Sequence, residues 1–493
     1  VPTRPRSKAI YDGFGRVIES RNPDDTFSTI RYGDWMTETI DENGHMQRSY
    51  SDAQGRLIKK EEYLGADGRG APVYPATGTG TNYYTLYATT EYTYDSEGNL
   101  TRTKDAHNNI TTIAYDKLGR KTQMTDLDMG TWSYGYDLNG NLLWQTDAKN
   151  QRIDFTYDDL NRLVNKSDGA NVNVNYTYDD VTVQYSKGRL TKADYRMSPT
   201  VTNDTRFRYD RVGREEQSTK VIDTTSYDVR RRYDAMNRLK DVEYPDTKKT
   251  YYTYNGGGQI ETVSFEDPSV DATALSQIPI VLDVDYNAHG QITHIEYGNG
   301  VATDYTYHPQ NLRLQRILTQ KVSPAAVIQD LNYTYDNIGD ILTIIDNVHT
   351  ADQSFQYDAL NRLKQATGYY CGAVASCTKT YDYNEIGNIT LKDTLTYVYG
   401  ENNAGPHAVT SLLNGATVTE SFAYDANGNM IIRTAGGIVT DYIYDVENRL
   451  KQVKKRNVVI AEYEYDGDGG RTKRTDFRAV NSGLYSCFLP GTK

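Results

Sequence analysis

Apolar and polar residues alternate along most of this chain, and residues 153–158 show the pattern clearly. Ile153, Phe155 and Tyr157 are each followed by a polar residue. Successive side chains of a β-strand point to opposite faces of its sheet, so this period of two is typical of a strand with one buried face. Residues 171–178 repeat the pattern, and the alternation predicts strands rather than helices.

Tyr-Asp pairs recur at a fixed distance along the chain. A step of 21 residues separates consecutive members of one run, which is Tyr94, Tyr115, Tyr136, Tyr157 and Tyr178. The same step joins further tyrosines in pairs, which are Tyr11 and Tyr32, Tyr233 and Tyr254, Tyr286 and Tyr307, and Tyr444 and Tyr465. Self-similarity at a fixed period is the signature of a repeat architecture, here an array of about twenty β-hairpins.

The residues after each Tyr-Asp pair predict a three-residue hairpin turn. Asp suits the first position of a type I turn, and the residue three places later must adopt the left-handed αL conformation, which favours Gly or Asn. That place holds Gly15, Gly55, Gly98, Gly119, Gly140, Gly213, Gly339, Gly428, Asn161, Asn237, Asn361 or Asn448. Asp179 has Thr182 there instead, which predicts a turn of another kind.

This turn geometry sets which residues face each other across the hairpin. It places Tyr157 opposite Leu163 on the buried face and Asp158 opposite Arg162 as an ion pair facing solvent. The same Asp/Arg closure recurs at Asp12/Arg16, Asp52/Arg56, Asp116/Arg120, Asp210/Arg214, Asp234/Arg238, Asp358/Arg362 and Asp445/Arg449, whereas Asp336/Asp340 brings like charges together. A second turn, such as residues 105–109 or 147–150, is expected on the far side of each unit.

Variation in the repeat divides the chain into six expected segments. They are residues 1–61 (N-terminal hairpin repeats), 62–90 (an insert rich in Gly, Pro and Thr), 91–260 (regular 21-residue repeats), 261–380 (repeats with longer inserts), 381–475 (C-terminal repeats) and 476–493 (a divergent tail). The inserts Gly65–Tyr84, Glu266–Asp283 and Pro309–Asp330 are expected to be loops or lengthened strands at the rim of the sheet.

The strand count constrains the architecture as well. About forty strands, spaced by about 4.8 Å, cannot form a flat sheet with one apolar face in water. The fold class expected is therefore an all-β repeat array of antiparallel hairpins that forms a large curled or spiral β-sheet shell.

Composition and charge narrow the class of partner. Tyr is unusually common, with 44 Tyr against 9 Phe and 3 Trp, and it suits a pleated, partly wet surface. The net charge of −12 argues against nucleic acid. No stretch approaches the roughly 20 apolar residues of a membrane span. Because neither end has a leader or a closing element, we expect a fragment of a longer protein.

Candidate chemistry is sparse. Cys371 and Cys377 are close enough in sequence to form a disulfide or to remain two free thiols, and Cys487 has no evident partner. None of the seven histidines shows a metal-ligand spacing; they are His45, His107, His289, His294, His308, His349 and His407. Asp466 and Asp468 favour a repeat turn with an extra residue over a calcium loop. We therefore expect no catalytic, cofactor-binding or metal-binding residue.

The units resemble the RHS/YD-repeat family along nearly the whole chain. The motif is a strand followed by Tyr-Asp-x-x-Gly/Asn-Arg-Leu, as at residues 157–163 and 357–363, and residues 405–412 look like the stretch that precedes the family's core. The resemblance implies a spiral β-shell. Such a shell encloses a C-terminal toxic domain in bacterial polymorphic toxins and in the B/C component of Tc toxins, and belongs to an adhesion ectodomain in teneurins. The family's self-cleaving Asp-Pro-x-Gly-Leu-like motif does not occur in this chain.

These features favour a non-enzymatic shell segment of a large secreted or cell-surface bacterial protein. We expect it to enclose or scaffold a toxin domain that is absent from this chain, and to have as partners the flanking core and cargo domains and other subunits of a secretion or toxin complex. We also expect residues 1–493 not to form a sealed container by themselves. The alternative is an adhesion or carbohydrate-binding surface, in which exposed Tyr rows would stack on sugars.

Overall fold

The computed structural model describes residues 6–68, 84–170, 172–196, 202–269, 277–370, 376–477 and 486–487. These residues form strands connected by turns and contain no helix, and so no helix long and apolar enough to cross a membrane.

The first twenty strands are β1 (Lys8–Tyr11), β2 (Val17–Arg21), β3 (Phe27–Tyr32), β4 (Met36–Ile40), β5 (Met46–Ser51), β6 (Leu57–Leu64), β7 (Thr85–Tyr94), β8 (Leu100–Lys104), β9 (Ile110–Tyr115), β10 (Lys121–Asp126), β11 (Gly130–Tyr136), β12 (Leu142–Thr146), β13 (Arg152–Tyr157), β14 (Leu163–Ser167), β15 (Asn173–Tyr178), β16 (Leu190–Arg196), β17 (Thr202–Tyr209), β18 (Glu215–Ile222), β19 (Thr225–Tyr233) and β20 (Leu239–Glu243).

The remaining strands are β21 (Lys249–Tyr254), β22 (Ile260–Glu266), β23 (Ile278–Tyr286), β24 (Ile292–Tyr297), β25 (Val301–Tyr307), β26 (Leu314–Lys321), β27 (Ala326–Tyr335), β28 (Ile341–Asp346), β29 (Gln353–Tyr357), β30 (Leu363–Gly368), β31 (Cys377–Tyr383), β32 (Ile389–Lys392), β33 (Leu395–Tyr399), β34 (Val409–Asn414), β35 (Thr417–Tyr424), β36 (Met430–Ala435), β37 (Ile438–Tyr444), β38 (Leu450–Lys455), β39 (Val458–Tyr465), β40 (Arg471–Asp476) and β41 (Ser486–Cys487).

Consecutive strands pair antiparallel, as the alternation predicts. Tyr157 of β13 pairs with Leu163 of β14, and the register shifts by one residue between Thr156 and Tyr157. The same shift occurs before the Tyr of other units, for example before Tyr94 and Tyr136. A three-residue turn that ends in αL produces this one-residue bulge, so turn and register are a single feature.

Backbone angles confirm the predicted turn. The φ angles are 94° at Gly98, 74° at Gly119, 93° at Gly140 and 59° at Asn161, all in the left-handed region. Asn108, in the turn on the far side of its unit, has a φ of 65° and shows that the far-side turns use the same geometry.

The Asp of each Tyr-Asp turn organises the turn through its carboxylate. Oδ1 of Asp158 accepts hydrogen bonds from the amides of Leu160 and Arg162, each at 2.9 Å, and Oδ2 accepts one from Nε of Arg162 at 2.7 Å. Where Asn replaces Arg, its side-chain amide makes the second contact, as Asn141 does with Asp137 at 2.8 Å. One carboxylate therefore holds both the turn and the first residue of the returning strand.

The Tyr of each unit is tied to the unit before it. The Tyr157 hydroxyl donates to the carbonyl of Leu142, at 3.0 Å, and the Tyr136 hydroxyl donates to that of Lys121, at 2.9 Å. Tyr32, Tyr254, Tyr307, Tyr424 and Tyr465 make the corresponding bond. Burial raises the pKa of Tyr157 above its ordinary value. This bond between units was not anticipated from the sequence.

The turn Arg also reaches the next unit, which corrects one expectation. The ion pair was expected to face solvent, but the Arg120 and Asp116 side chains are each only 24% exposed. The Arg120 guanidinium lies 5.0 Å from the ring centre of Tyr136, and its Nη1 donates to the Asp137 carbonyl. Arg16, Arg56, Arg162, Arg214, Arg238, Arg362 and Arg449 lie over the next Tyr in the same way.

Exceptions in the sequence have identifiable structures. Asp179 begins a longer loop that closes through a hydrogen bond from its amide to the Arg189 carbonyl, so its turn is of another kind, as predicted. The Asp466 turn is an ordinary one, with Gly469 at a φ of 85°, and the expected extra residue is not there.

The inserts have different outcomes. Residues 309–330 form a turn followed by the lengthened strands β26 and β27, as predicted. Several expectations fall on residues outside the described ranges. They concern much of the inserts Gly65–Tyr84 and Glu266–Asp283, most of the tail 476–493, and Cys371, for which a disulfide to Cys377 and a free thiol were the two alternatives.

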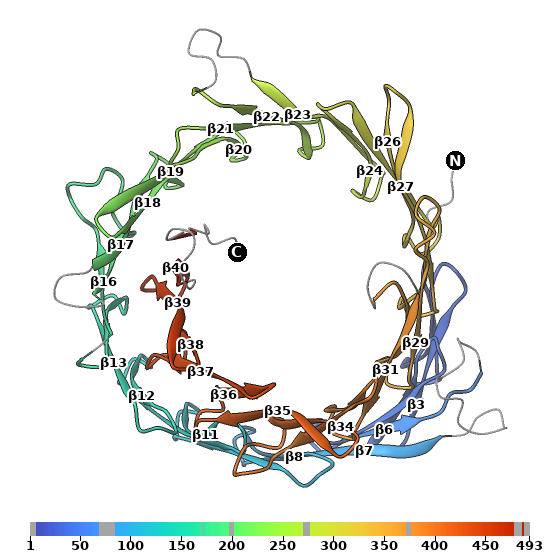
Figure 1. The fold of residues 1–493 in the computed structure, drawn as a ribbon. Helices are drawn as coiled ribbons and strands as arrows, with labels where there is room; N and C mark the ends of the chain where they lie inside the picture. The colour runs from blue at the N-terminus through green and yellow to red at the C-terminus, as the bar shows by residue number, and fades with distance from the viewer. Residues whose placement is uncertain are drawn as a thin grey trace. The chain divides into compact units, whose positions relative to one another are not determined.

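The chain divides into two compact units, and each unit combines stretches that are far apart in sequence. Unit 1 comprises Val1–Ile110, Gln259–Thr262 and Pro279–Tyr397, and unit 2 comprises Thr111–Gly258, Val263–Ile278 and Val398–Lys493. Within unit 1, β3 and β6 lie near β29 and β31, and within unit 2, β11–β13 lie near β36–β38 (Figure 1).

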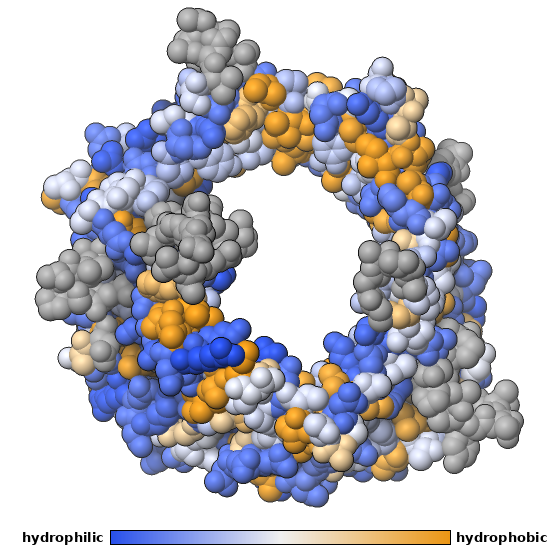
Figure 2. Space-filling view, viewed as in Figure 1, coloured by the Kyte–Doolittle hydropathy of each residue, from blue (hydrophilic) through white to orange (hydrophobic). Residues whose placement is uncertain are grey.

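A conventional core is small in this fold. The buried apolar cluster in unit 2 consists of Val172, Val174 and Tyr195, and Tyr176 and Val446 pack against it. Hydrophobic residues also lie at the surface, for example over β26 and β27 in unit 1, where Val322, Val327 and Ile328 are exposed (Figure 2). Most strand residues are half-buried, so bonds within and between hairpins carry more of the stabilisation than a deep core.

We expect Gly119→Val to lower the melting temperature more than Lys117→Val does. Val at a φ of 74° is strained by about 1–3 kcal/mol, whereas a surface substitution beside it costs at most about 0.5 kcal/mol. Thermal denaturation of the two purified variants measures the difference. Equal melting shifts would contradict the turn assignment.

We expect Tyr136→Phe to cost about 1 kcal/mol, since it removes only the hydroxyl that donates to the Lys121 carbonyl. Tyr134→Phe, two residues earlier on the same face of β11, leaves that bond intact and is the matched control. Hydrogen exchange of the β10–β11 region should increase in the first variant and stay unchanged in the second. No difference between the two would show that the bond between units contributes nothing.

Candidate functional site

Turns from distant stretches of the chain meet inside each unit. We call the contact in unit 1 seam 1; it joins far-side turns 41–45 and 105–109 to Tyr-Asp turns 336–340 and 358–362 and to the equivalent turn 384–388. We call the contact in unit 2 seam 2; it joins far-side turns 126–130 and 147–151 to loop 400–408 and to Tyr-Asp turns 425–429 and 445–449. Partners lie roughly 280–320 residues apart in sequence, as in the bonds from Asn427 to Asp147 and from His45 to Asn361.

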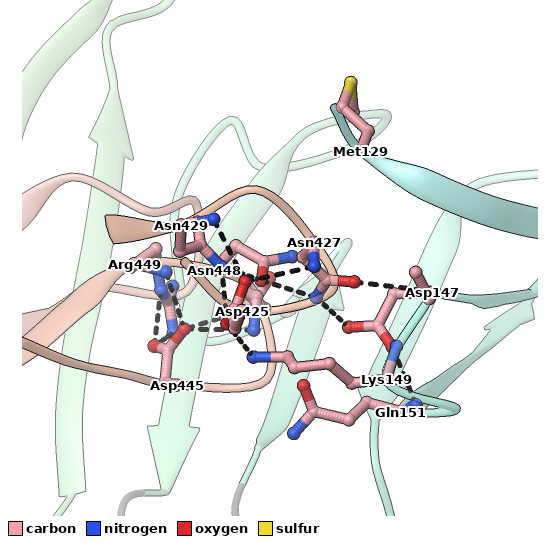
Figure 3. A network of polar contacts seen from close by, with 12 residues as sticks. Met129, Asp147, Lys149, Gln151, Asp425, Asn427, Asn429, Asp445, Asn448 and Arg449 are labelled. Atoms are coloured by element: carbon pink, nitrogen blue, oxygen red, sulfur yellow. Dashed lines mark hydrogen bonds and ion pairs between the residues drawn. The ribbon is translucent and has the colours of Figure 1, made fainter. Parts of the chain in front are cut away.

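Asn427 is the centre of seam 2, and its side chain is buried with only 7% exposed (Figure 3). Its Nδ2 donates to Oδ2 of Asp147 at 2.5 Å and to Oδ1 of Asn448 at 2.8 Å. Its Oδ1 accepts the amide hydrogen of Ala148 at 2.9 Å. One amide side chain therefore bonds a far-side turn and a neighbouring Tyr-Asp turn at once.

An ion pair lies beside Asn427 (Figure 3). Nζ of Lys149 is 2.9 Å from Oδ2 of Asp425, the Asp that caps its own Tyr-Asp turn. Burial by itself raises the pKa of Asp425, but the hydrogen bonds from Lys149 and Asn429 outweigh it, so the pKa lies below its ordinary value. The charged carboxylate thus serves both its turn and the seam.

The next contact along unit 2 consists of an ion pair and a close apolar approach between the same two stretches of chain. Nζ of Lys166 lies 2.5 Å from Oε1 of Glu447 and 2.9 Å from the carbonyl oxygen of Gly467. A Cβ at Gly467 would lie 2.5 Å from Cγ1 of Val174, so the close approach of the two stretches requires glycine there.

Seam 1 repeats the plan of seam 2 with other residues. Nδ2 of Asn43 donates to Oδ2 of Asp336 at 2.9 Å, and Oδ1 of Asn43 accepts the amide hydrogen of Asn337 at 3.1 Å. Asn43 is 3% exposed, and in both seams a buried Asn therefore bonds an Asp and a backbone amide across the contact.

A cavity of about 410 Å³ opens beside seam 1. The side chains of Asp41, His45, Lys60, Glu62 and Asn361 contribute to its lining. Nδ1 of His45 is 2.8 Å from Oδ1 of Asn361 and 3.4 Å from Oδ2 of Asp41. These contacts place a titratable group at the junction between the two stretches.

The like-charged pair Asp336/Asp340 also lies at seam 1. Burial raises the pKa of Asp340, and the nearby Asp336 carboxylate raises it further. Nη1 of Arg313, from the preceding unit, donates to the Asp336 carbonyl. The sequence showed the break in the Asp/Arg pattern but not its position at a contact between distant hairpins.

Five of the seven histidines face a carboxylate, and these five separate into two groups. His45, His107 and His407 lie at the seams, whereas His294 and His349 pair with Asp304 and Asp346 of their own hairpins. Nothing in the spacing of the seven histidines distinguishes the two groups.

Asp466 and Asp468, the two residues considered for a calcium loop, accept hydrogen bonds that stabilise the fold. Oδ1 of Asp466 accepts the amide hydrogen of Gly470 at 2.7 Å, and Oδ1 of Asp468 accepts the Tyr176 hydroxyl hydrogen at 3.2 Å. Within the described ranges no group of three or more His, Cys, Asp and Glu side chains is arranged to hold a metal ion. The arrangement of the seams provides binding between segments of chain.

We expect Asn427→Asp to destabilise unit 2 by about 2 kcal/mol or more, because it places a carboxylate against Asp147 in a buried site. The second substitution Asp147→Asn should restore most of the loss by reversing the roles of amide and carboxylate. Asn139→Asp, at the same place in a turn outside the seam, is the control. Thermal melting measures all four proteins, and equal effects of Asn427→Asp and Asn139→Asp would contradict the assignment of the seam.

Comparison with known proteins finds relatives of these repeats. A family model described as the teneurin YD-shell matches residues 72–189. Toxin subunit YenC1 of Yersinia entomophaga is 36% identical over 103 residues, which cover 18% of this chain and 11% of YenC1. The tRNA nuclease WapA of Bacillus subtilis is 27% identical over 223 residues, which cover 42% of this chain and 8% of WapA.

Solved structures match over nearly the whole chain. The crystal structure of TcdB2-TccC3 has a TM-score of 0.79 at 19% identity, covering 97% of this chain and 27% of that chain. The Tc holotoxin pore of Photorhabdus luminescens also gives a TM-score of 0.79 at 19% identity, covering 96% of this chain and 26% of that chain. The present chain thus spans only a small part of each relative.

The predicted fold class, an all-β repeat array of antiparallel hairpins of the YD-shell type, is confirmed by these matches and by the strand pairing. The repeat, its turn geometry and the comparisons agree that this chain resembles the RHS/YD-repeat proteins.

Proposed function

We propose that this chain is a wall segment of a shell that encloses a polypeptide cargo in a toxin-like protein. The observation that carries the proposal is the match to TcdB2-TccC3 over 97% of the chain, with a TM-score of 0.79. The similarity to toxin subunit YenC1 supports the same class of protein. In this proposal the cargo is a toxin or effector domain that residues 1–493 do not include.

The seams support a wall function on physical grounds. Each joins two stretches of sheet through buried amide and ion-pair contacts, as at Asn427 and Lys149. A buried Asn that bonds an Asp and an amide fixes the registration of the two stretches, because any slip leaves buried polar groups without partners. Stretches fixed in this way make a continuous surface within each unit, which a wall requires.

We propose further that the wall segment itself is not an enzyme. In the Tyr-Asp turns the abundant Asp residues accept turn amides and Arg or Asn side chains, as Asp158 and Asp137 do. The nuclease activity in the name of WapA is not carried over, because this chain covers only 8% of that protein.

The proposed setting is a secreted or cell-surface bacterial protein. Its partners would be the flanking core and cargo domains and other subunits of a toxin complex. The six segments defined from the sequence remain a proposal about how the repeat varies along the wall. The rival function, an open surface that binds carbohydrate or another cell, differs from a shell in leaving both sheet faces accessible.

Neighbouring residues on one strand test the proposal. Thr89 and Thr90 of β7 are both half-buried and face opposite sides of the sheet. We expect Thr89→Cys and Thr90→Cys to react with a maleimide carrying a polyethylene glycol chain of about 5 kDa at rates that differ at least about tenfold. The physical reason is that only one face of a closed shell is open to a large reagent.

The labelling uses the complete polypeptide that contains residues 1–493, with Cys371, Cys377 and Cys487 replaced by Ser. A small maleimide is the control, and it should label both positions. Similar rates with the large reagent would overturn enclosure and favour the open binding surface.

A further inference from the structure

Three histidines lie at contacts between distant turns, and each is close to a carboxylate. Nε2 of His107 lies 2.8 Å from Oε2 of Glu385 in seam 1, and Nδ1 of His407 lies 2.7 Å from Oδ2 of Asp128 in seam 2. His45 lies between Asp41 and Asn361 in seam 1. Recurrence in both units indicates a common feature of the seams.

His45 is the most buried of the three, with 8% of its side chain exposed. The acidic groups around it come from several elements. Asp41 belongs to its own turn, Asp336 and Asp340 come from turn 336–340, and Glu62 comes from β6 across the cavity.

Two cations face the same region as His45. They are Lys60, which lines the cavity, and Arg313, which acts on Asp340. The four carboxylates outnumber the two cations, so the surroundings of His45 carry a net negative charge. This charge favours the protonated, positively charged form of the imidazole.

His107 and His407 also face mainly acidic groups. Asp105 lies in the turn of His107, and Arg362 acts on its partner Glu385 from the neighbouring turn. Asp126 and Asp128 lie together beside His407. Both histidines are partly exposed.

We propose that seam 1 is a pH-sensitive clasp, held by protonated His45 and loosened as the solution turns from mildly acidic to alkaline. Protonation places a positive charge between carboxylates that belong to different stretches of chain, and deprotonation leaves those carboxylates facing a neutral ring. The clasp does not depend on what the protein encloses.

The direction of the pH effect follows from His45. Its pKa is raised above 6.5, because the bonds to Asp41 and Asn361 outweigh the effect of burial. The contribution of His45 to stability is therefore fully present below pH 6.5, the ordinary pKa of histidine, and is lost as the pH rises through the higher pKa of His45 in the folded protein.

Asp41 sets the lower end of the pH range in which seam 1 is stable. Its pKa is lowered below 3.8 by His45 and Asn361 despite burial, and its contribution is lost only as the pH falls through that lower value. The raised pKa of Asp340 acts in the same direction as His45, since neutralising this carboxyl relieves its repulsion with Asp336. The window of greatest seam stability thus lies in mild acid.

Hydrogen exchange of residues 1–493 tests the clasp at one backbone amide. The Asn337 amide donates to Asn43 across seam 1 and reports directly on its closure. After correction for intrinsic exchange, we expect its protection to fall by about threefold or more between about pH 6 and about pH 8. His45→Gln should remove most of this dependence.

His294→Gln is the matched control. It removes a His–Asp pair of the same kind, at 2.7 Å, between the paired strands β24 and β25 of unit 1. This variant should keep the wild-type pH dependence at Asn337. His45→Lys, which stays charged through this range, should keep the seam protected at about pH 8. An unchanged pH dependence in His45→Gln, or an equal loss in His294→Gln, would overturn the proposal.

Discussion

The structure depends on a link between successive hairpins that is made by one Tyr, one Asp and one Arg per unit. The Asp caps its own turn, the Arg returns to that Asp and lies over the next Tyr, and the next Tyr donates its hydroxyl to the carbonyl after the Arg. Arg120, Asp116 and Tyr136 show the whole arrangement. Because many units are linked to the next by bonds of this kind, the 21-residue period and the recurrence of the same residue types at the same places of the turn have a common cause.

This link explains how a chain with so little deep core can be ordered. A protein of this size normally buries a large aliphatic interior, but the buried cluster here consists of Val172, Val174 and Tyr195. Tyr replaces the aliphatic core because its ring packs on a half-buried sheet while its hydroxyl satisfies a backbone carbonyl. Each bond is worth about 1 kcal/mol, and its regular repetition along the array makes it important.

The seams add a second set of contacts, which join parts of the chain that are distant in sequence. The links between hairpins act between neighbours in sequence, but Asn427 and Asn43 each join stretches almost 300 residues apart. Such contacts are slow to form and costly in chain entropy, so they need specific polar partners to select one registration. The same polar character makes them sensitive to charge, which a wholly apolar contact would not be. The proposed wall function and the proposed response to pH therefore rest on the same choice of Asp, Asn and His at these turns.

The amino-acid sequence by itself determined the strands, the turns and the register, because these depend on residues close in the chain. Gly119 and Asn161 at positive φ, and Tyr157 opposite Leu163, follow from the αL preference and from the period of two. The tyrosine bond to the preceding unit could have been suspected from the constant spacing, but alternation alone does not show where a hydroxyl points. Only the tertiary structure decided which turns meet. Nothing local distinguishes His107 from His289, or Asn427 from Asn139, because each seam joins turns roughly 280 residues apart in sequence, and which turns meet does not depend on the residues of any one turn.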